Sequence, residues 1–174
     1  MEPAGCPATR SVTPLITVAA TRRSTPTRWR TSSTGRKGSN ARCHREPSGE
    51  NLTTLGVDLT ATRIGTRYRV GDTLLLEVSA PRIPCRTFAD WLGETGWVKT
   101  FTADGRPGTC LRVIEPEPVQ ANDPLRVGYV PDHEITVGFA FRALTTQREL
   151  LPTLAHVAAL PSEERDRAQR AADG

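Results

Sequence analysis

Short apolar runs separated by turn residues dominate residues 49–130. Residues 64–70 (IGTRYRV) and 74–78 (LLLEV) are rich in β-branched and apolar positions, and Gly71-Asp72 between them is a turn signal. These two runs predict a β-hairpin. Further strands are predicted at residues 110–114 (CLRVI) and 125–130 (LRVGYV). Several short strands at close spacing are typical of a compact barrel rather than a parallel sheet.

Helical patterns occur in two other parts of the chain. Residues 87–92 and 96–104 predict short helical turns between the hairpin and the next strand. After residue 130, apolar positions at helical spacing predict helices over 135–144 and 149–160, with Pro152 expected at the start of the second. Ser162 is expected to be the N-cap of a last helix with acidic residues in its first turn. A small helical bundle should therefore close the chain.

The first 48 residues lack both kinds of pattern. Arg, Ser, Thr and Pro fill 27 of these 48 positions, while Leu, Ile and Val together supply four. A stretch of this composition buries too little apolar area to offset the entropy of ordering it. We therefore expect little packing and no regular structure there. Three explanations stay open: a disordered basic tail, an Arg/Ser-rich transit peptide, or a stretch translated out of frame.

Charge divides the chain at the same point. Residues 1–48 hold 9 Lys/Arg against 2 Asp/Glu, whereas residues 49–174 hold 14 against 17. The pI near 9.2 therefore comes from the first segment, and the net negative charge of the remainder opposes binding to a nucleic-acid backbone. No apolar run approaches the roughly 18 residues that a membrane span needs. The composition favours a soluble, cytoplasmic protein without nucleic-acid or membrane partners.

Four cysteines fit neither a metal-binding pair nor a disulfide framework, and we expect reduced thiols. The four are Cys6, Cys43, Cys85 and Cys110. Cys85 ends the stretch Pro81-Arg82-Ile83-Pro84-Cys85, in which two prolines predict a rigid extended loop. Arg82 and Arg86 give this thiol the positive surroundings that lower a thiol pKa. The alternative is a buried structural cysteine, which is what we expect of Cys110 in its apolar run.

Two motifs in order resemble a known family. Gly49-Glu50-Asn51-Leu52 is followed, after the Gly-Asp hairpin, by the Pro81–Cys85 loop. This order resembles the MOSC domain, and in particular its bacterial branch linked to N-hydroxylaminopurine resistance. The resemblance covers residues 49 to about 127, and the helices after His133 resemble the small helical module of that branch. It implies a mainly β fold with α: a MOSC-type, pyruvate-kinase-like β-barrel over 49–130, incomplete in this chain, and a helical segment over 131–174.

The same resemblance implies a cofactor and its site. Cys85 would be the catalytic residue and would bind the metal of a molybdenum cofactor (molybdopterin), since soft sulfur ligands suit a metal already held by a dithiolene. Asn51 corresponds to a family position near the pterin, Arg82 would bind the cofactor phosphate, and Glu50 and Thr53 complete the implied cofactor-binding set. Pyridoxal phosphate binding is a further association at the family level.

The implied activity is reduction of an N-hydroxylated base or amine, with electrons from a redox partner. One alternative is a non-catalytic carrier of sulfur or of the molybdenum cofactor that uses the same cysteine. Another is a basic, nucleic-acid-binding tail joined to an inert barrel. Trp91 and Trp97 are expected to be lids on the barrel rather than a base-stacking platform, because the folded part has net negative charge.

The family pattern also favours a frameshift just before Glu50. Read from the third base of GC-rich codons, residues 16–29 can become HGGGHEAVYAYAV and residues 37–48 can become GLERPLPPGAFG. Both strings resemble segments that precede the GENL motif in MOSC domains. The first strands of the barrel would then be missing, with strand edges left exposed. Sequencing the encoding DNA tests this: a one-base correction should open a frame with both strings, and stop codons in that frame would contradict it.

Overall fold

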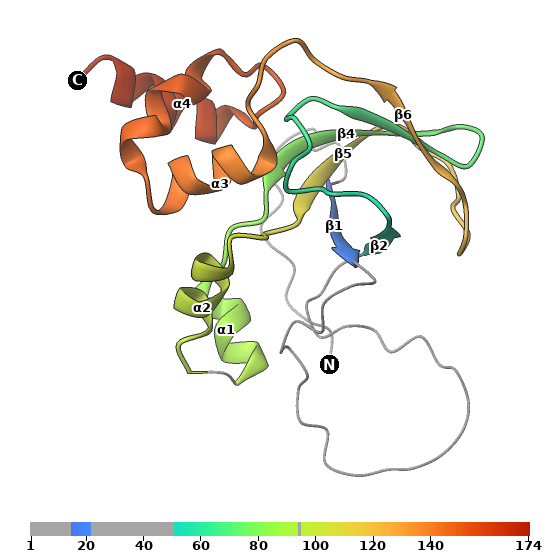
Figure 1. Cartoon of the computed structure of the whole chain (residues 1–174), viewed down its shortest axis with the longest axis horizontal. Coiled ribbons are helices and arrows are strands. Elements are labelled where there is room, and N and C mark those ends of the chain that lie inside the picture. Colours follow the sequence, from blue (N-terminus) through green and yellow to red (C-terminus); the bar gives the residue numbers. More distant parts are fainter. Residues whose placement is uncertain (1–14, 22–50, 94) are drawn as a thin grey trace.

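The computed structural model contains a mixed β-sheet with two groups of helices beside it (Figure 1). It describes residues 51–93 and 95–174 and, for the backbone alone, residues 15–21. The strands are β1 (Leu15–Thr21), β2 (Leu52–Leu55), β3 (Arg67–Val70), β4 (Leu74–Pro81), β5 (Thr109–Glu115) and β6 (Leu125–Tyr129). Helices α1 (Arg86–Leu92) and α2 (Trp97–Asp104) lie between β4 and β5, and α3 (Val137–Thr145), the 3-10 helix η1 (Arg148–His156) and α4 (Ser162–Ala172) follow β6.

The sheet is open, with the strand order β2-β1-β5-β4-β3-β6. The β1–β2 pair is parallel, and the other neighbours are antiparallel. A barrel needs a hydrogen-bonded neighbour on both sides of every strand, and β2 and β6 each have one neighbour among the described strands. In the part of the chain that the structure describes, the sheet is therefore not closed into the expected β-barrel, which was predicted to be incomplete in this chain.

Strand β1 corrects the expectation that the first 48 residues lack regular structure. It pairs with β2 on one side and with β5 on the other. Three of the four Leu, Ile and Val residues of that segment lie within residues 15–21, and such residues favour strands. Averaging composition over 48 residues concealed this short run. The rest of residues 1–50 lie outside the described residues, and the frameshift stays a prediction.

Most of the elements expected after residue 49 are confirmed. Strands β3 and β4 form the predicted hairpin, in register from Arg67↔Glu77 to Val70↔Leu74. Helices α1, α2 and α3 and strands β5 and β6 lie where the pattern predicts them.

Two details of the C-terminal helices differ from the expectation. Helix η1 begins at Arg148 and contains Pro152, whose fixed φ is compatible with a 3-10 helix. The N-cap of α4 is Pro161 rather than Ser162, and it makes no side-chain capping bond. Here the tight turn after η1, rather than a serine cap, sets the start of α4.

The hydrophobic core joins the sheet to the C-terminal helices. Helix α3 buries six of its nine residues, as its apolar surface predicts. Strand β4 is buried along almost its whole length, and β5 alternates buried and half-buried positions over its first five residues. The largest side chains below 2% exposure are Phe141, Ile64, Leu76, Leu111, Leu154 and Leu160. In Figure 1, α3 and α4 gather at one end of the curved sheet.

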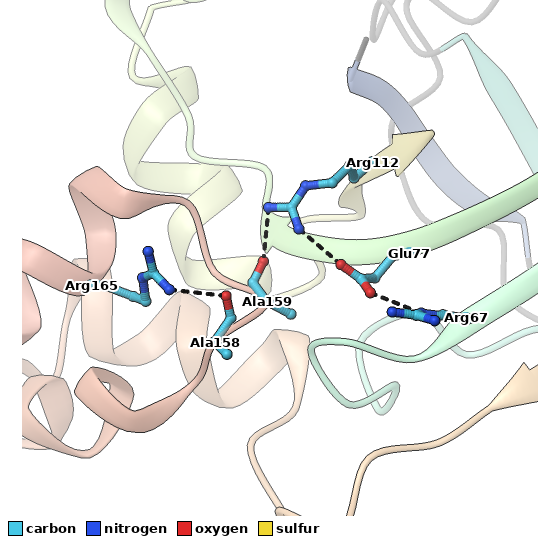
Figure 2. Close-up of polar contacts among 6 residues, drawn as sticks. All are labelled: Arg67, Glu77, Arg112, Ala158, Ala159 and Arg165. Carbon is cyan, nitrogen blue, oxygen red and sulfur yellow. Dashed lines mark hydrogen bonds and ion pairs between the residues drawn. The ribbon is translucent and has the colours of Figure 1, made fainter. Parts of the chain in front are cut away.

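A row of charged residues crosses three strands and reaches the helices (Figure 2). The register pairs Arg67 with Glu77 and Glu77 with Arg112. The Glu77 carboxylate is buried and accepts one bond from Arg67 Nε at 2.9 Å and one from Arg112 Nη1 at 2.9 Å. Arg112 also donates through Nη2 to the Ala159 carbonyl at 3.3 Å. This charged row therefore fixes the sheet against the turn that precedes α4.

Candidate functional site

The loop after β4 presents Cys85 to solvent. Strand β4 ends at Pro81, and residues 82–85 have no regular structure, as the two prolines predict. Cys85 is the N-cap of α1, with extended backbone (φ −121°, ψ 158°), and its Sγ accepts the backbone N–H of Phe88 at 3.4 Å. The thiol is free and exposed, so the alternative of a buried structural cysteine is wrong. Cys110 is likewise not disulfide-bonded and lies half-buried in β5.

Two arginines flank this thiol in the sequence. The Arg82 guanidinium lies over the Phe88 ring, with its carbon 4.5 Å from the ring centroid. The backbone N–H of Arg82 donates to the Gly108 carbonyl at 3.4 Å, which ties the loop to the segment that enters β5. Arg86 is the first residue of α1 and is exposed. The Cys85 loop is thus held from both sides while its sulfur stays accessible.

An aromatic row, formed by Phe88, Trp97, Phe101 and Phe141, connects α1 to α3. Successive ring centroids lie 4.9, 4.8 and 6.2 Å apart. Trp97 is 7% exposed, whereas Trp91 is 67% exposed. Neither tryptophan is a lid on a barrel, because the sheet is open and both residues belong to the helices α1 and α2, which connect β4 to β5. That part of the expectation is wrong.

The sheet register brings the other implied site residues to the same end of the sheet. One row across four strands consists of Pro81, Thr109, Val18 and Leu52. Neighbouring strands lie about 4.8 Å apart, so the row spans about 14 Å. Arg82 follows this row after the end of β4, Asn51 immediately precedes β2, and Thr53 is the second residue of β2.

Asn51 and Thr53 lie on opposite sides of this row, and the direction of β2 decides which of them lies on the side of Arg82. β2 runs in the same sense as β4, because β4 and β1 are both antiparallel to β5 and β1 is parallel to β2. Thr53 is therefore displaced from the row toward the same side as Arg82, and Asn51 toward the other. Both side chains are exposed. Glu50 lies outside the described residues.

A small cavity lies beside the Cys85 loop. Its volume is about 130 Å³, and it is lined by Ile83, Leu144, Glu163, Glu164 and Arg167. The Glu164 Oε2 is buried without a hydrogen-bond partner, and burial raises the pKa of this carboxyl above its ordinary value. Sequence reasoning treated Glu163 and Glu164 only as helix-dipole residues, since no local signal indicates that the start of α4 meets residue 83.

No group of three or more His, Cys, Asp and Glu side chains among the described residues is arranged to hold a metal ion. None of the helices seen in the described part of the chain is long and apolar enough to cross a bilayer.

A family model and a curated relative match this chain. The model described as the MOSC domain matches residues 17–126, so the match includes most of β1. A curated protein named "Reductase", from Gibberella moniliformis, is 30% identical over 113 residues, which are 65% of this chain and 20% of that protein. The chain thus spans about a fifth of that relative's length.

Two solved structures share the fold. The crystal structure of YiiM from Geobacillus stearothermophilus has a TM-score of 0.72 at 21% identity, covering 90% of this chain and 77% of the other. YiiM from Escherichia coli has a TM-score of 0.61 at 26% identity, covering 70% of this chain and 61% of the other. The mixed sheet with its C-terminal helices is therefore an arrangement seen in solved proteins.

Proposed function

The chain belongs to the MOSC domain family, and from this premise we propose that it binds a molybdenum cofactor through Cys85 and reduces N-hydroxylated bases or amines. The observation that carries the proposal is the free, exposed thiol of Cys85, held as the N-cap of α1. Cysteine is not among the residues that usually cap helices, so this position calls for a reason other than helix stability. The relative named "Reductase" supports reductive chemistry.

The side chains of the implied cofactor-binding set suit the implied cofactor. A thiolate is a soft ligand and adds one sulfur to a metal that the dithiolene of its pterin already holds. Arg82 offers a guanidinium, the group that recognises phosphate through two parallel hydrogen bonds. The Asn51 amide can both donate to and accept from a pterin ring, and the Thr53 hydroxyl can do the same. The sheet register, in which Pro81, Thr109, Val18 and Leu52 form one row across four strands, supports this grouping.

The cofactor and the protein would contribute different parts of the proposed reaction. Reduction of R–NHOH to R–NH₂ breaks the N–O bond, consumes two electrons and two protons, and releases water. When bound, the cofactor would supply the two-electron chemistry, and a redox partner would supply the electrons. The protein contributes the position of the Cys85 sulfur, fixed by its bond from the Phe88 N–H, and the positive charge of Arg82 and Arg86.

The proposal also covers the cellular compartment and the role of pyridoxal phosphate. Neither Cys85 nor Cys110 is disulfide-bonded, which suits a reducing compartment, and we assign the protein to the cytoplasm on that ground. Pyridoxal phosphate has no part in the proposed reaction, because its chemistry runs through a lysine Schiff base and the lysine of the described ranges, Lys99, is exposed on α2.

A carrier of sulfur or of the molybdenum cofactor is the alternative, and the exposure of Cys85 favours it as well. The two are separated by purifying the full chain from a host that makes the cofactor and from one that does not. We expect bound molybdenum, and reduction of N-hydroxylaminopurine by a reduced viologen dye, in the first preparation alone. Molybdenum without turnover would favour the carrier, and neither molybdenum nor turnover would contradict both.

A further inference from the structure

Trp91 is the most exposed large apolar side chain in the described part of the chain, at 67%. Its ring lies against Phe88, with centroids 5.5 Å apart and planes tilted by 33°. The aromatic row itself continues from Phe88 through the buried Trp97 without it. Packing therefore accounts for the contact of Trp91 with Phe88, and leaves most of the indole surface open to solvent.

The thiol and the exposed indole both contact Phe88. Cys85 is the N-cap that precedes α1, whereas Phe88 and Trp91 lie three residues apart within α1 and are neighbours on its surface. The Phe88 N–H bonds the Cys85 Sγ at 3.4 Å, and its ring contacts Trp91. Six residues of helix rise about 9 Å. The thiol and the indole are thus less than two helical turns apart.

The cap at the end of α1 and the contacts of Phe88 fix the position of Trp91. Gly93 caps α1 in the left-handed conformation (φ 69°), and its N–H donates to the carbonyls of Ala89 at 3.1 Å and Asp90 at 3.2 Å. The Phe88 ring that supports the indole is itself contacted by the Arg82 guanidinium at 4.5 Å and by Trp97 at 4.9 Å. A flat aromatic surface is therefore held on a rigid backbone near the reactive sulfur.

We propose that Trp91 is a specificity-determining residue of the Cys85 site, whose exposed indole stacks on the conjugated ring of the substrate. This proposal rests on the proposed function of Cys85. Stacking requires a π face and no particular pattern of donors and acceptors, so every base can use it. Trp91 should therefore favour flat, conjugated N-hydroxylated substrates over aliphatic hydroxylamines, which have no ring to stack.

Binding tests the proposal without turnover. Equilibrium dialysis with radiolabelled adenine is carried out on the full chain from a cofactor-making host, on Trp91→Leu and Trp91→Phe, and on Val98→Ala. Val98 is a matched control, since it is an exposed apolar residue of the neighbouring helix α2. We expect the affinity for adenine to fall about tenfold in Trp91→Leu, and to stay near the wild-type value in Trp91→Phe and Val98→Ala. Equal affinity in Trp91→Leu and wild type, or no binding to wild type, would overturn the proposal.

Turnover separates this proposal from the one on which it rests. With N-hydroxylaminopurine, Trp91→Leu should raise KM about tenfold at little change in kcat, and with N-methylhydroxylamine both constants should stay as in wild type. Equal losses on both substrates would indicate a structural role and overturn the proposal. If wild type reduces neither substrate but dialysis still distinguishes Trp91→Leu, the proposed function fails and the stacking role stands. If dialysis shows no difference while wild type is active, the stacking role fails and the proposed function stands.

Discussion

Cys85→Ser is expected to abolish molybdenum-dependent reduction of N-hydroxylated substrates while leaving the fold intact. Serine keeps the shape of the side chain, and its hydroxyl can accept the Phe88 N–H that Sγ accepts at 3.4 Å, so the start of α1 should be retained. A serine hydroxyl stays protonated at neutral pH and is a poor substitute for a soft thiolate ligand. The measurement is dye-linked turnover, with circular dichroism as the check on folding.

Cys110→Ala is the matched control for that experiment. Cys110 is the other cysteine of the described residues; it is not disulfide-bonded and lies half-buried in β5, beside the buried Leu111. Its truncation should cost about 1 kcal/mol of stability and spare the turnover of the folded protein. Full activity in Cys85→Ser, or equal losses in both variants, would contradict the assignment of Cys85.

Glu77→Ala is expected to lower the free energy of unfolding by about 2–3 kcal/mol. The Glu77 side chain is 9% exposed and accepts hydrogen bonds from both Arg67 and Arg112. Its loss leaves two guanidinium groups facing each other with no anion between them. Arg67 is 44% and Arg112 29% exposed, and solvent screening of these groups places the cost below that of a fully buried pair. Urea denaturation measures it.

Glu115→Ala is the control for the charged row. Glu115 also lies in the sheet and pairs with an arginine, Arg69, but the two atoms are 3.5 Å apart and Glu115 is 56% exposed. Exposed pairs of this kind contribute about 0.2–1 kcal/mol, so this variant should remain close to wild type. If Glu115→Ala and Glu77→Ala lose the same stability, the charged row does not hold the sheet to the helices.

Local signals in the sequence predicted the local structure and missed the arrangement of the sheet. The Gly71-Asp72 turn between two β-rich runs was enough to predict the β3–β4 hairpin. The strand order depends on pairings between distant segments, such as β1 with β5, which no short motif determines. The strand order and the strand at residues 15–21 were therefore beyond that reasoning, which predicted an incomplete barrel where the described strands form an open sheet.

For the candidate site too, local features could be predicted from the sequence and tertiary contacts could not. Two prolines in residues 81–85 predicted the loop that exposes Cys85, because they act on the local backbone. The contact of Arg82 with Phe88 and the packing of Phe101 on Phe141 depend on the tertiary fold, and the sequence carried no sign of them. The charged row was equally hidden, since Arg67, Glu77 and Arg112 become neighbours only through strand register.

The most direct measurement of the central claim is X-ray absorption at the molybdenum edge, on the full chain purified from a cofactor-making host and on its Cys85→Ser variant. If Cys85 binds the metal, the wild-type spectrum should contain one more sulfur neighbour of molybdenum than the variant spectrum, and an oxygen neighbour or an open position should replace it in the variant. The Cys110→Ala spectrum should match wild type. Identical sulfur counts in wild type and Cys85→Ser would contradict the account.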